Sequence, residues 1–370
     1  MGEIKLVLEP TCNQTCYSLH AHRTINQNEV EYIMATMKAA QVSKAGGKFE
    51  LVDKPIPEPQ SNQVLIKVEA CGICHSDYFV KEGVFPGIQY PRVPGHEVIG
   101  KIVKTGSDVQ GWKEGERVGV GWHGGHCFHC EPCRKGDFIN CENAQISGIS
   151  YDGGYAEYMT APFEALARVP AELSSADAAP LLCAGITTYN ALRNSGAKPG
   201  ALVAVLGIGG LGHLALQYCR AAGYRTIALS HGSSKEALAL ELGAHYYINT
   251  EKMDPAKELA KMGGADVILA TAPNSKAISH LVGGLSSRGN LVIVAAAADN
   301  MEVVPFALLS GKRISGWPSG HAKESEETLE FSAMSNIRPK IETFPLEKVN
   351  EAYDKMITNK VRFRAVLTME

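Results

Sequence analysis

Residues 201–223 read ALVAVLGIGGLGHLALQYCRAAG. ALVAVL is a short continuous apolar run of the kind found in buried parallel strands, and LGHLALQYCRAAG has the pattern of a helix. The glycines between them have the spacing GxGxxG. The first permits a tight turn, the second lets the backbone approach a pyrophosphate, and the third lets the helix pack closely on the sheet. The stretch therefore predicts a dinucleotide site at a helix N-terminus. The alternative is an ordinary glycine-rich turn. The residues concerned are Gly207, Gly209, Gly210, Leu211 and Gly212.

The alternation of strand and helix continues beyond this stretch. The runs TIAL, ADVILA and NLVIVA have the character of strands, whereas SSKEALALELGA and SKAISHLVGGL have the character of helices. Such alternation is typical of a doubly wound parallel sheet with helices on both faces. We expect this domain to extend over residues 185–319.

The chain on either side of this domain has a different pattern. Residues 37–184 contain short strand-like runs such as NQVLIKVEA, separated by turn residues, and predict a mainly β domain. Residues 320–370 are mixed, with a helix near LEKVNEAYDKMIT and a last strand near RAVLTM, and we expect them to complete the β domain. Residues 1–36 have no clear period. Although they hold two cysteines and two histidines, we expect a poorly ordered leader there.

The composition limits the class of protein. A chain of 370 residues predicts about two domains. The net charge of -3 favours neither nucleic acid nor an anionic membrane as partner, and the longest apolar runs are too short to span a bilayer. Ten cysteines without a secretory signal indicate metal binding or chemistry more than disulfides. We therefore expect a soluble, cytoplasmic protein.

Four cysteines stand close together in the run CFHCEPCRKGDFINC, with the spacing C-x2-C-x2-C-x7-C. Four thiolates so close in sequence suit one tetrahedral Zn²⁺, and a closed four-thiolate shell is the structural type of zinc site. The run predicts a structural zinc site formed by Cys127, Cys130, Cys133 and Cys141.

A second set of metal-binding residues lies outside that run. Cys74 stands in CHSD after a predicted strand, His96 in GHE before the next one, and Cys183 in PLLCAGITTY near the domain boundary. Taken singly, each has an ordinary structural explanation, such as a small buried hydrophobe for Cys183. Two thiolates and an imidazole together form the three-ligand shell of a catalytic zinc, with a fourth position open.

The end of the second strand of the parallel domain bears on the choice of dinucleotide. Sites that prefer NAD place Asp or Glu there, to bind the ribose 2′-hydroxyl. This chain has Ser230, His231, Ser233 and Lys235 instead, which could receive a 2′-phosphate. We expect NADP(H), with NAD(H) as the alternative. The same residues could simply start the next helix, with Ser233 or Ser234 as its N-cap.

The motifs GICHSD, VPGHEVIG, CFHCEPC, PLLCAGITTY and GIGGLG occur in one order over residues 37–370. In this the chain resembles the zinc-containing medium-chain alcohol dehydrogenases. The resemblance implies a GroES-like β domain, a Rossmann domain, two zinc ions per chain and a homodimer or homotetramer. It also implies that Cys74, His96 and Cys183 hold the catalytic zinc. Further roles follow from matched family positions: Glu97 can approach the zinc as a fourth ligand, Asp77 orients the histidine, Arg364 contacts the pyrophosphate and Thr187 lies beside the nicotinamide.

The resemblance also implies hydride transfer between a small alcohol or aldehyde and the nicotinamide. Several relatives have a relay histidine where this chain has Phe79, so we expect Ser76 to accept the alcohol proton. The proton would then leave through water, the cofactor ribose or a side chain such as His75. Candidate walls of the substrate pocket, for which ordinary packing is the alternative, are Trp122, His123, Phe85 and Trp317.

Two stretches of the sequence resemble different branches of the family and so point to different substrates. SHGSSK resembles the NADP-using, cinnamyl-alcohol-dehydrogenase-like branch, whereas PLLCAGITTY and Trp122 resemble the NAD-dependent ethanol-type branch. A polyol dehydrogenase or an enzyme for formaldehyde conjugates would share the same fold, and a non-catalytic zinc and nucleotide binder is a third class to be distinguished. A four-cysteine nucleic-acid module is disfavoured, because only Arg134 and Lys135 are basic in that lobe.

Overall fold

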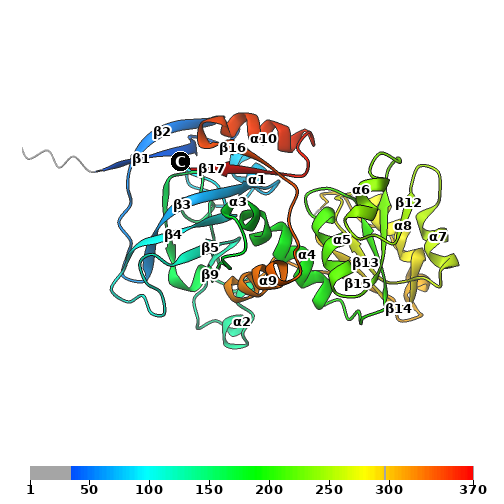
Figure 1. Ribbon diagram of the computed structural model, residues 1–370. Coiled ribbons are helices and arrows are strands. Elements are labelled where there is room, and N and C mark those ends of the chain that lie inside the picture. Colours follow the sequence, from blue (N-terminus) through cyan, green and yellow to red (C-terminus); the bar gives the residue numbers. More distant parts are fainter. Residues whose placement is uncertain (1–34, 296, 370) are drawn as a thin grey trace, which may run out of the picture. The chain divides into compact units, whose positions relative to one another are not determined.

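The structure is a computed structural model that describes residues 35–295 and 297–369, so the expected leader lies almost entirely outside the described residues. The doubly wound parallel sheet predicted from the glycine turn is confirmed (Figure 1). Its strand order is β12-β11-β10-β13-β14-β15, and every neighbouring pair is parallel. The strands are β10 (Leu202–Leu206), β11 (Arg225–Ser230), β12 (Tyr246–Asn249), β13 (Ala265–Ala270), β14 (Leu285–Ile293) and β15 (Arg313–Gly316).

Strand β10 shows how this sheet buries both faces. Val203 and Val205 belong to a hydrophobic cluster that also includes residues of α5, while Ala204 and Leu206 belong to a second cluster with residues of α7 and α8. Successive side chains of a strand point to opposite faces, so a continuous apolar run is required here. The helices of this part are α4 (Ala184–Arg193), α5 (Gly212–Ala221), α6 (Glu236–Glu241), α7 (Pro255–Lys261) and α8 (Ser275–Leu281).

The strand order changes direction beside β10. The strand that follows β10 in sequence, β11, lies on one side of it, and the later strand β13 lies on the other. Ligands of open α/β sheets bind at the carboxyl ends of strands at such a switch point. The glycine turn follows β10 directly and therefore lies at this point.

The β-rich part is built on a seven-stranded sheet of order β16-β17-β3-β4-β5-β9, with β8 pairing with β3 off that path. The last strand of the chain, β17, runs antiparallel to β3, and Ala365 lies opposite Ile73. The C-terminal strand thus lies beside the strand that leads to Cys74. The strands are β3 (Gln63–Ile73), β4 (Val98–Thr105), β5 (Arg117–Val120), β8 (Tyr158–Pro162), β9 (Leu166–Arg168), β16 (Ile341–Pro345) and β17 (Arg364–Thr368).

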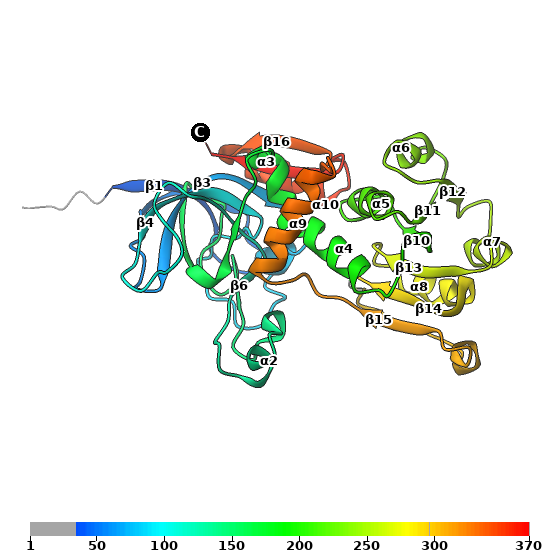
Figure 2. The same cartoon turned by 60° about the horizontal axis from the view of Figure 1, so that its bottom comes forward.

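Two small sheets and five α-helices lie outside the two large sheets and the helices given above. Strand β1 (Thr36–Val42) pairs with β2 (Phe49–Pro55), and β6 (His123–Gly125) pairs with β7 (Gln145–Ile146). Figure 2 shows α2 on a lobe that continues from β6. The helices are α1 (Asp77–Glu82), α2 (Glu131–Arg134), α3 (Ser175–Ala178), α9 (Ala322–Met334) and α10 (Val349–Ile357).

Two local features differ from or add to the sequence expectations. Helix α6 begins at Glu236 with Lys235 as its N-cap, so the assignment of Ser233 or Ser234 as the cap is wrong. A turn in which the amide of Glu236 donates to the carbonyl of Ser233 precedes the helix and displaces the cap by one residue or more. Residues 322–334, where only a mixed pattern was expected, form a helix with a capping box between His321 and Glu324.

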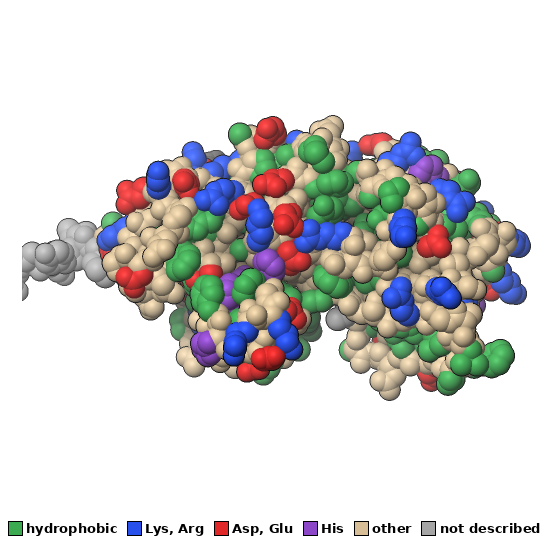
Figure 3. All heavy atoms as spheres, turned by 90° about the horizontal axis from the view of Figure 1, so that it is seen from below, with side chains coloured by type: hydrophobic (Ala, Val, Ile, Leu, Met, Phe, Trp, Pro, Cys, Tyr) green, Lys and Arg blue, Asp and Glu red, His purple; other side chains and the backbone are tan. Residues whose placement is uncertain are grey.

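The surface carries both signs of charge. On the face shown in Figure 3, Lys and Arg side chains are interspersed with Asp and Glu side chains. Among the described residues, no helix has the length and apolar character that a membrane crossing requires.

Candidate active site

Asp77 organises the segment that follows β3. One carboxylate oxygen, Oδ2, accepts hydrogen bonds from the backbone N–H of Cys74 and from the hydroxyl of Tyr155, both at 2.8 Å. The second oxygen, Oδ1, lies 3.2 Å from Nδ1 of His96. Asp77, His96 and Tyr155 are all buried. Asp77 thus holds the backbone of Cys74 and the ring of His96 in one arrangement.

Cys183 reaches the same place from the start of α4. Its Sγ lies 3.6 Å from Sγ of Cys74, and one ligand atom from each of Cys74, His96, Glu97 and Cys183 lies within 4.8 Å of the others. Nε2 of His96 is buried and has no hydrogen-bond partner among the described residues. Because Nδ1 faces Asp77, Nε2 is the nitrogen available as a ligand. Two sulfurs and one nitrogen are the donor set that Zn²⁺ accepts, so these residues fit the metal.

The ionisation of the group agrees with a cation site. The contact with Cys183 lowers the pKa of the Cys74 thiol well below its usual value; burial opposes this shift and His96 reinforces it. Burial lowers the pKa of His96, but Asp77 and Cys74 outweigh burial and raise it well above its usual value. When a divalent cation binds beside the thiolate, the imidazole can lose its proton and become a metal ligand.

Glu97 adjoins this group and forms a buried ion pair with Arg364. Burial raises the pKa of Glu97 to about 7, against the lowering effect of Arg364. Oε2 of Glu97 has no hydrogen-bond partner among the described residues. Arg364 is the first residue of β17, and the pairing of β17 with β3 brings it here.

The remaining residues of the CHSD motif lie toward solvent. Oγ of Ser76 lies 3.7 Å from Sγ of Cys74, and Ser76 is half-buried. His75 is exposed and stacks on Tyr78 with ring centroids 5.8 Å apart. Phe79, also half-buried, is the third residue of α1.

The four candidate pocket residues fall into different surroundings. Trp122 lies edge-on to His96 with centroids 5.1 Å apart, and Phe85 lies edge-on to Trp122 at 6.4 Å. His123 is turned to two further histidines: its Nε2 is 3.0 Å from Nδ1 of His126, and its ring is 6.4 Å from that of His321. Trp317 packs, half-buried, against the core cluster that contains Val203. Of the four, only Trp122 is placed beside a candidate zinc ligand by these contacts, and Phe85 packs on Trp122.

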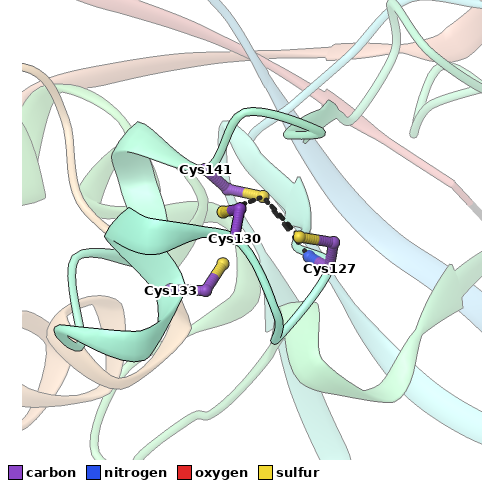
Figure 4. A group of neighbouring side chains, drawn as sticks. All are labelled: Cys127, Cys130, Cys133 and Cys141. Atoms are coloured by element: carbon purple, nitrogen blue, oxygen red, sulfur yellow. Dashed lines mark hydrogen bonds between the residues drawn. The ribbon is translucent and has the colours of Figure 1, made fainter.

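The four clustered cysteines converge in the lobe beside β6 (Figure 4). One sulfur from each lies within 4.8 Å of the others. Sγ of Cys141 accepts hydrogen bonds from the backbone N–H groups of Cys127 and Asn143, both at 3.3 Å. Burial raises the pKa of the Cys141 thiol above its usual value, and these two backbone donors oppose that shift. Four converging sulfurs fit a closed tetrahedral zinc shell.

The glycines of the turn differ in the space around them, and the turn is open at Gly209. A Cβ at Gly212 would overlap the carbonyl oxygen of Gly207, so α5 can start this close to β10 only with glycine there. At Gly209, by contrast, a Cβ would meet no heavy atom within 4 Å, so this part of the turn is open to a ligand. A Cβ at Gly210 would lie 3.0 Å from Nη1 of Arg364. The turn and Arg364 together fit a pyrophosphate.

The end of β11 carries the residues expected to select the cofactor. Ser230 is buried, whereas His231 and Ser233 are exposed. Nζ of Lys235 donates to the carbonyl of Ile208 in the glycine turn at 2.8 Å. Thr187 is buried in the first turns of α4, and its amide donates to the carbonyl of Cys183 at 3.0 Å.

Two residues that the sequence analysis did not single out lie at these sites. Tyr155 is the second partner of Asp77, and Glu251 lies 3.0 Å from Nε2 of His231. Glu251 follows β12, the neighbour of β11. No strand was predicted over residues 246–249, so the rule that the carboxyl ends of parallel neighbours meet at one edge could not be applied to Glu251 before the structure showed β12.

Known proteins confirm the suggested family. The chain matches the family described as alcohol dehydrogenase GroES-like domain over residues 60–171 and that described as zinc-binding dehydrogenase over residues 210–334. It is 46% identical over 336 residues to the alcohol dehydrogenase patD of Penicillium expansum, a match that covers 90% of this chain and 98% of the relative.

Solved structures agree. A cinnamyl alcohol dehydrogenase from Sorghum bicolor has a TM-score of 0.81 and 30% identity, over 90% of this chain and 98% of its own. A CAD from Helicobacter pylori complexed with NADP(H) has a TM-score of 0.81 and 27% identity over the same shares. With its GroES-like domain and Rossmann-type parallel sheet, this chain is a member of the zinc-containing medium-chain alcohol dehydrogenase family.

Proposed function

We propose that this protein is a zinc-dependent alcohol dehydrogenase that interconverts a primary alcohol and its aldehyde with NADP(H). The observation that carries the proposal is the unpartnered, buried Nε2 of His96, a residue whose ligand atom lies within 4.8 Å of the sulfurs of Cys74 and Cys183. In this proposal Cys74, His96 and Cys183 hold a catalytic zinc, and Glu97 can serve as a fourth ligand. The four cysteines of the lobe hold a second, structural zinc.

When bound, zinc supplies Lewis acidity to the substrate oxygen and the nicotinamide exchanges hydride with the substrate carbon. The chain's own residues supply position and proton transfer. Asp77 fixes the tautomer and angle of His96. Ser76 accepts the alcohol proton at its Oγ as it passes its own hydroxyl proton to water, which its partial exposure lets it reach. His75, exposed on the same turn, offers a further acceptor.

Cofactor binding is assigned to the glycine turn, with Arg364 facing the pyrophosphate and Thr187 beside the nicotinamide. The buried Ser230 in place of an acidic residue supports NADP(H), as does Lys235, whose ammonium lies against the glycine turn. His231 and Ser233, both exposed on the same loop, complete this set. The complex of the Helicobacter pylori relative with NADP(H) is consistent with this choice. The NAD-dependent alternative predicts the opposite order of kcat/KM for the two cofactors.

The aromatic pair beside His96 bears on the substrate. The ring of Trp122 is nearly perpendicular to that of His96, and Phe85 packs on Trp122 in the same way. Aromatic walls favour apolar and planar groups, so we propose allylic, aromatic or medium-chain alcohols and aldehydes as substrates. A polyol, which needs polar partners, fits such walls less well.

A homodimer is supported by the edge of the parallel sheet. Among the described residues, β15 has β14 as its only strand partner. The preceding segment exposes Val304 by 70%, Phe306 by 80% and Leu309 by 77%. An exposed strand edge beside an apolar patch is suited to pairing with a second copy. A homotetramer built from two such pairs is the alternative, and light scattering distinguishes them.

Metal analysis combined with substitution tests the zinc assignment. The wild-type protein should contain two zinc ions per chain, and Cys183→Ala should contain one, without turnover but with NADPH binding retained. Cys219→Ala removes a buried thiol outside both groups and should keep two zinc ions and turnover. Turnover in Cys183→Ala would refute the catalytic assignment. Kinetics with NADPH and NADH test the cofactor, and a tenfold preference for NADH would refute the NADP(H) choice.

A further inference from the structure

A carboxylate from the neighbouring strand lies at the end of β11, where the chain itself has Ser230. The amide of Thr250, just after β12, donates to the carbonyl of Ser230 at 3.0 Å, so the two strand ends lie side by side. The next residue, Glu251, places Oε1 3.0 Å from Nε2 and 3.1 Å from Nδ1 of His231. Its second oxygen, Oε2, would lie 3.6 Å from a Cβ at Gly232.

The backbone that carries Glu251 is held firmly to the loop after β11. Oδ1 of Asn249 accepts the amide of Gly232 at 3.1 Å and the amide of Glu251 at 3.0 Å. The hydroxyl of Tyr247 donates to the carbonyl of Gly232 at 2.7 Å. One side-chain oxygen thus ties the two loops together, which keeps the carboxylate of Glu251 near His231.

We propose that Glu251 is a specificity-determining residue that weakens binding of the cofactor's 2′-phosphate. The proposal rests on the assignment of His231, Ser233 and Lys235 as the residues facing that phosphate. A phosphate that hydrogen-bonds to His231 lies beside Glu251, because Glu251 already contacts the same ring. Two like charges at such a distance repel. Glu251 also contacts the ring nitrogens of His231 that a phosphate would use as hydrogen-bond donors.

A negative charge at this position repels only the cofactor that carries a 2′-phosphate. NAD(H) has a neutral 2′-hydroxyl. This hydroxyl can donate a hydrogen bond to a carboxylate, as it does to the acidic residue of NAD sites. Glu251 therefore moderates the preference for NADP(H) and lets the protein retain measurable use of NAD(H). The acidic residue thus stands after β12, the third strand of the domain along the chain, and not at the end of β11, the second.

Direct binding tests the proposal without turnover. The full chain and Glu251→Gln are titrated calorimetrically with 2′,5′-ADP, which carries the 2′-phosphate, and with 5′-AMP, which lacks it. We expect Glu251→Gln to tighten 2′,5′-ADP about fivefold, the order expected for one nearby like charge at a protein surface, and to change 5′-AMP by less than about twofold. The gain should shrink as salt is raised.

Glu258→Gln is the matched control. Glu258 lies on α7 in the same domain and pairs with Lys261 at 2.6 Å, so its removal changes the net charge equally but away from His231. It should leave both dissociation constants unchanged. The ratio of kcat/KM for NADPH to that for NADH should rise in Glu251→Gln by the same factor as the binding ratio.

An unchanged or equally changed affinity for the two nucleotides in Glu251→Gln would overturn the proposal, as would weaker binding of 2′,5′-ADP. The cofactor assignment is judged separately, from the wild-type protein. If the wild type bound 5′-AMP more tightly than 2′,5′-ADP, the NADP(H) preference would fail. The change caused by Glu251→Gln would still decide the role of Glu251.

Discussion

The guanidinium of Arg364 forms a buried ion pair with the carboxylate of Glu97 and also lies against the glycine turn at Gly210. Glu97 belongs to the candidate zinc cluster, and Gly210 belongs to the candidate cofactor turn. One side chain therefore contacts both parts of the site. Its positive charge is the partner that permits a carboxylate to be buried there.

Replacing Arg364 tests this dependence. Arg364→Met should lower the free energy of unfolding by about 3 kcal/mol, because it leaves a buried carboxylate without its cation. Arg364→Met combined with Glu97→Gln should recover part of the loss. Urea unfolding at pH 7 measures both. Lys101→Met, which breaks an exposed pair with Glu69, should cost less than about 1 kcal/mol. Equal losses in Arg364→Met and Lys101→Met would contradict the buried-pair interpretation.

The glycine turn offers two substitutions with opposite expectations. Gly209→Ala adds a methyl group into open space, so the melting temperature should change little while the cofactor dissociation constant rises, because the methyl stands where the backbone must approach a ligand. Gly212→Ala forces the carbonyl of Gly207 to move and should lower the melting temperature as well. Thermal unfolding and a cofactor titration of each variant separate the two effects. The same fall in melting temperature for both would argue against the distinction.

The cysteine lobe should affect stability before chemistry. Cys130→Ser replaces one of four converging sulfurs, and we expect the zinc content to fall from two to one per chain. The melting temperature should drop, because the site forms only in the folded chain and metal binding there contributes to the free energy of folding. The remaining soluble protein should keep its catalytic zinc. An unchanged zinc content and melting temperature would show that the lobe does not depend on a metal.

His213 should make stability sensitive to acid. It is fully buried, its Nδ1 lies 2.9 Å from the carbonyl of Gly209, and its Nε2 accepts the amide of Lys340 at 3.2 Å. Burial lowers the pKa of His213 to about 3, from an ordinary 6.5. Between these values the unfolded chain binds a proton that the folded chain does not, so stability is present above pH 6.5 and is lost as the pH falls toward 3.

The expected slope is on the order of 1 kcal/mol per pH unit within that window. His213→Gln, which keeps a donor and an acceptor but does not titrate, should flatten the dependence measured by urea unfolding at pH 7, 6 and 5. His280→Gln changes an exposed histidine and should leave most of the slope in place. If His213→Gln retained the full slope, the acid sensitivity would have to come from different groups, such as the buried His123.

Several features of the fold followed from local patterns. The run ALVAVL, the glycine spacing and the helix after it were sufficient for β10, the turn and α5, because a two-faced buried strand requires continuous apolar residues. The runs TIAL and ADVILA likewise became β11 and β13. The helix of residues 322–334 was not predicted, since its capping signal starts from a histidine and its apolar pattern is weak.

The metal clusters differ in how far sequence could define them. Cys127, Cys130, Cys133 and Cys141 lie within one short segment, so their spacing alone brings four sulfurs together. Cys74, His96 and Cys183 are far apart along the chain, and their proximity was expected from motif order and resemblance. The resemblance also implied that Asp77 orients the histidine; the tertiary structure adds that Nδ1 of His96 faces Asp77 while Nε2 has no partner among the described residues.

Residue types and short-range spacing were thus enough to indicate a dinucleotide turn, a four-sulfur site and the family, because each depends on neighbours in the chain. The pairing of Arg364 with Glu97 required β17 to lie beside β3, and the approach of Glu251 to His231 required β12 to lie beside β11. Sheet pairing joins residues that no sequence period relates. For that reason the pairing of Arg364 with Glu97 and that of Glu251 with His231 became visible only in the folded chain.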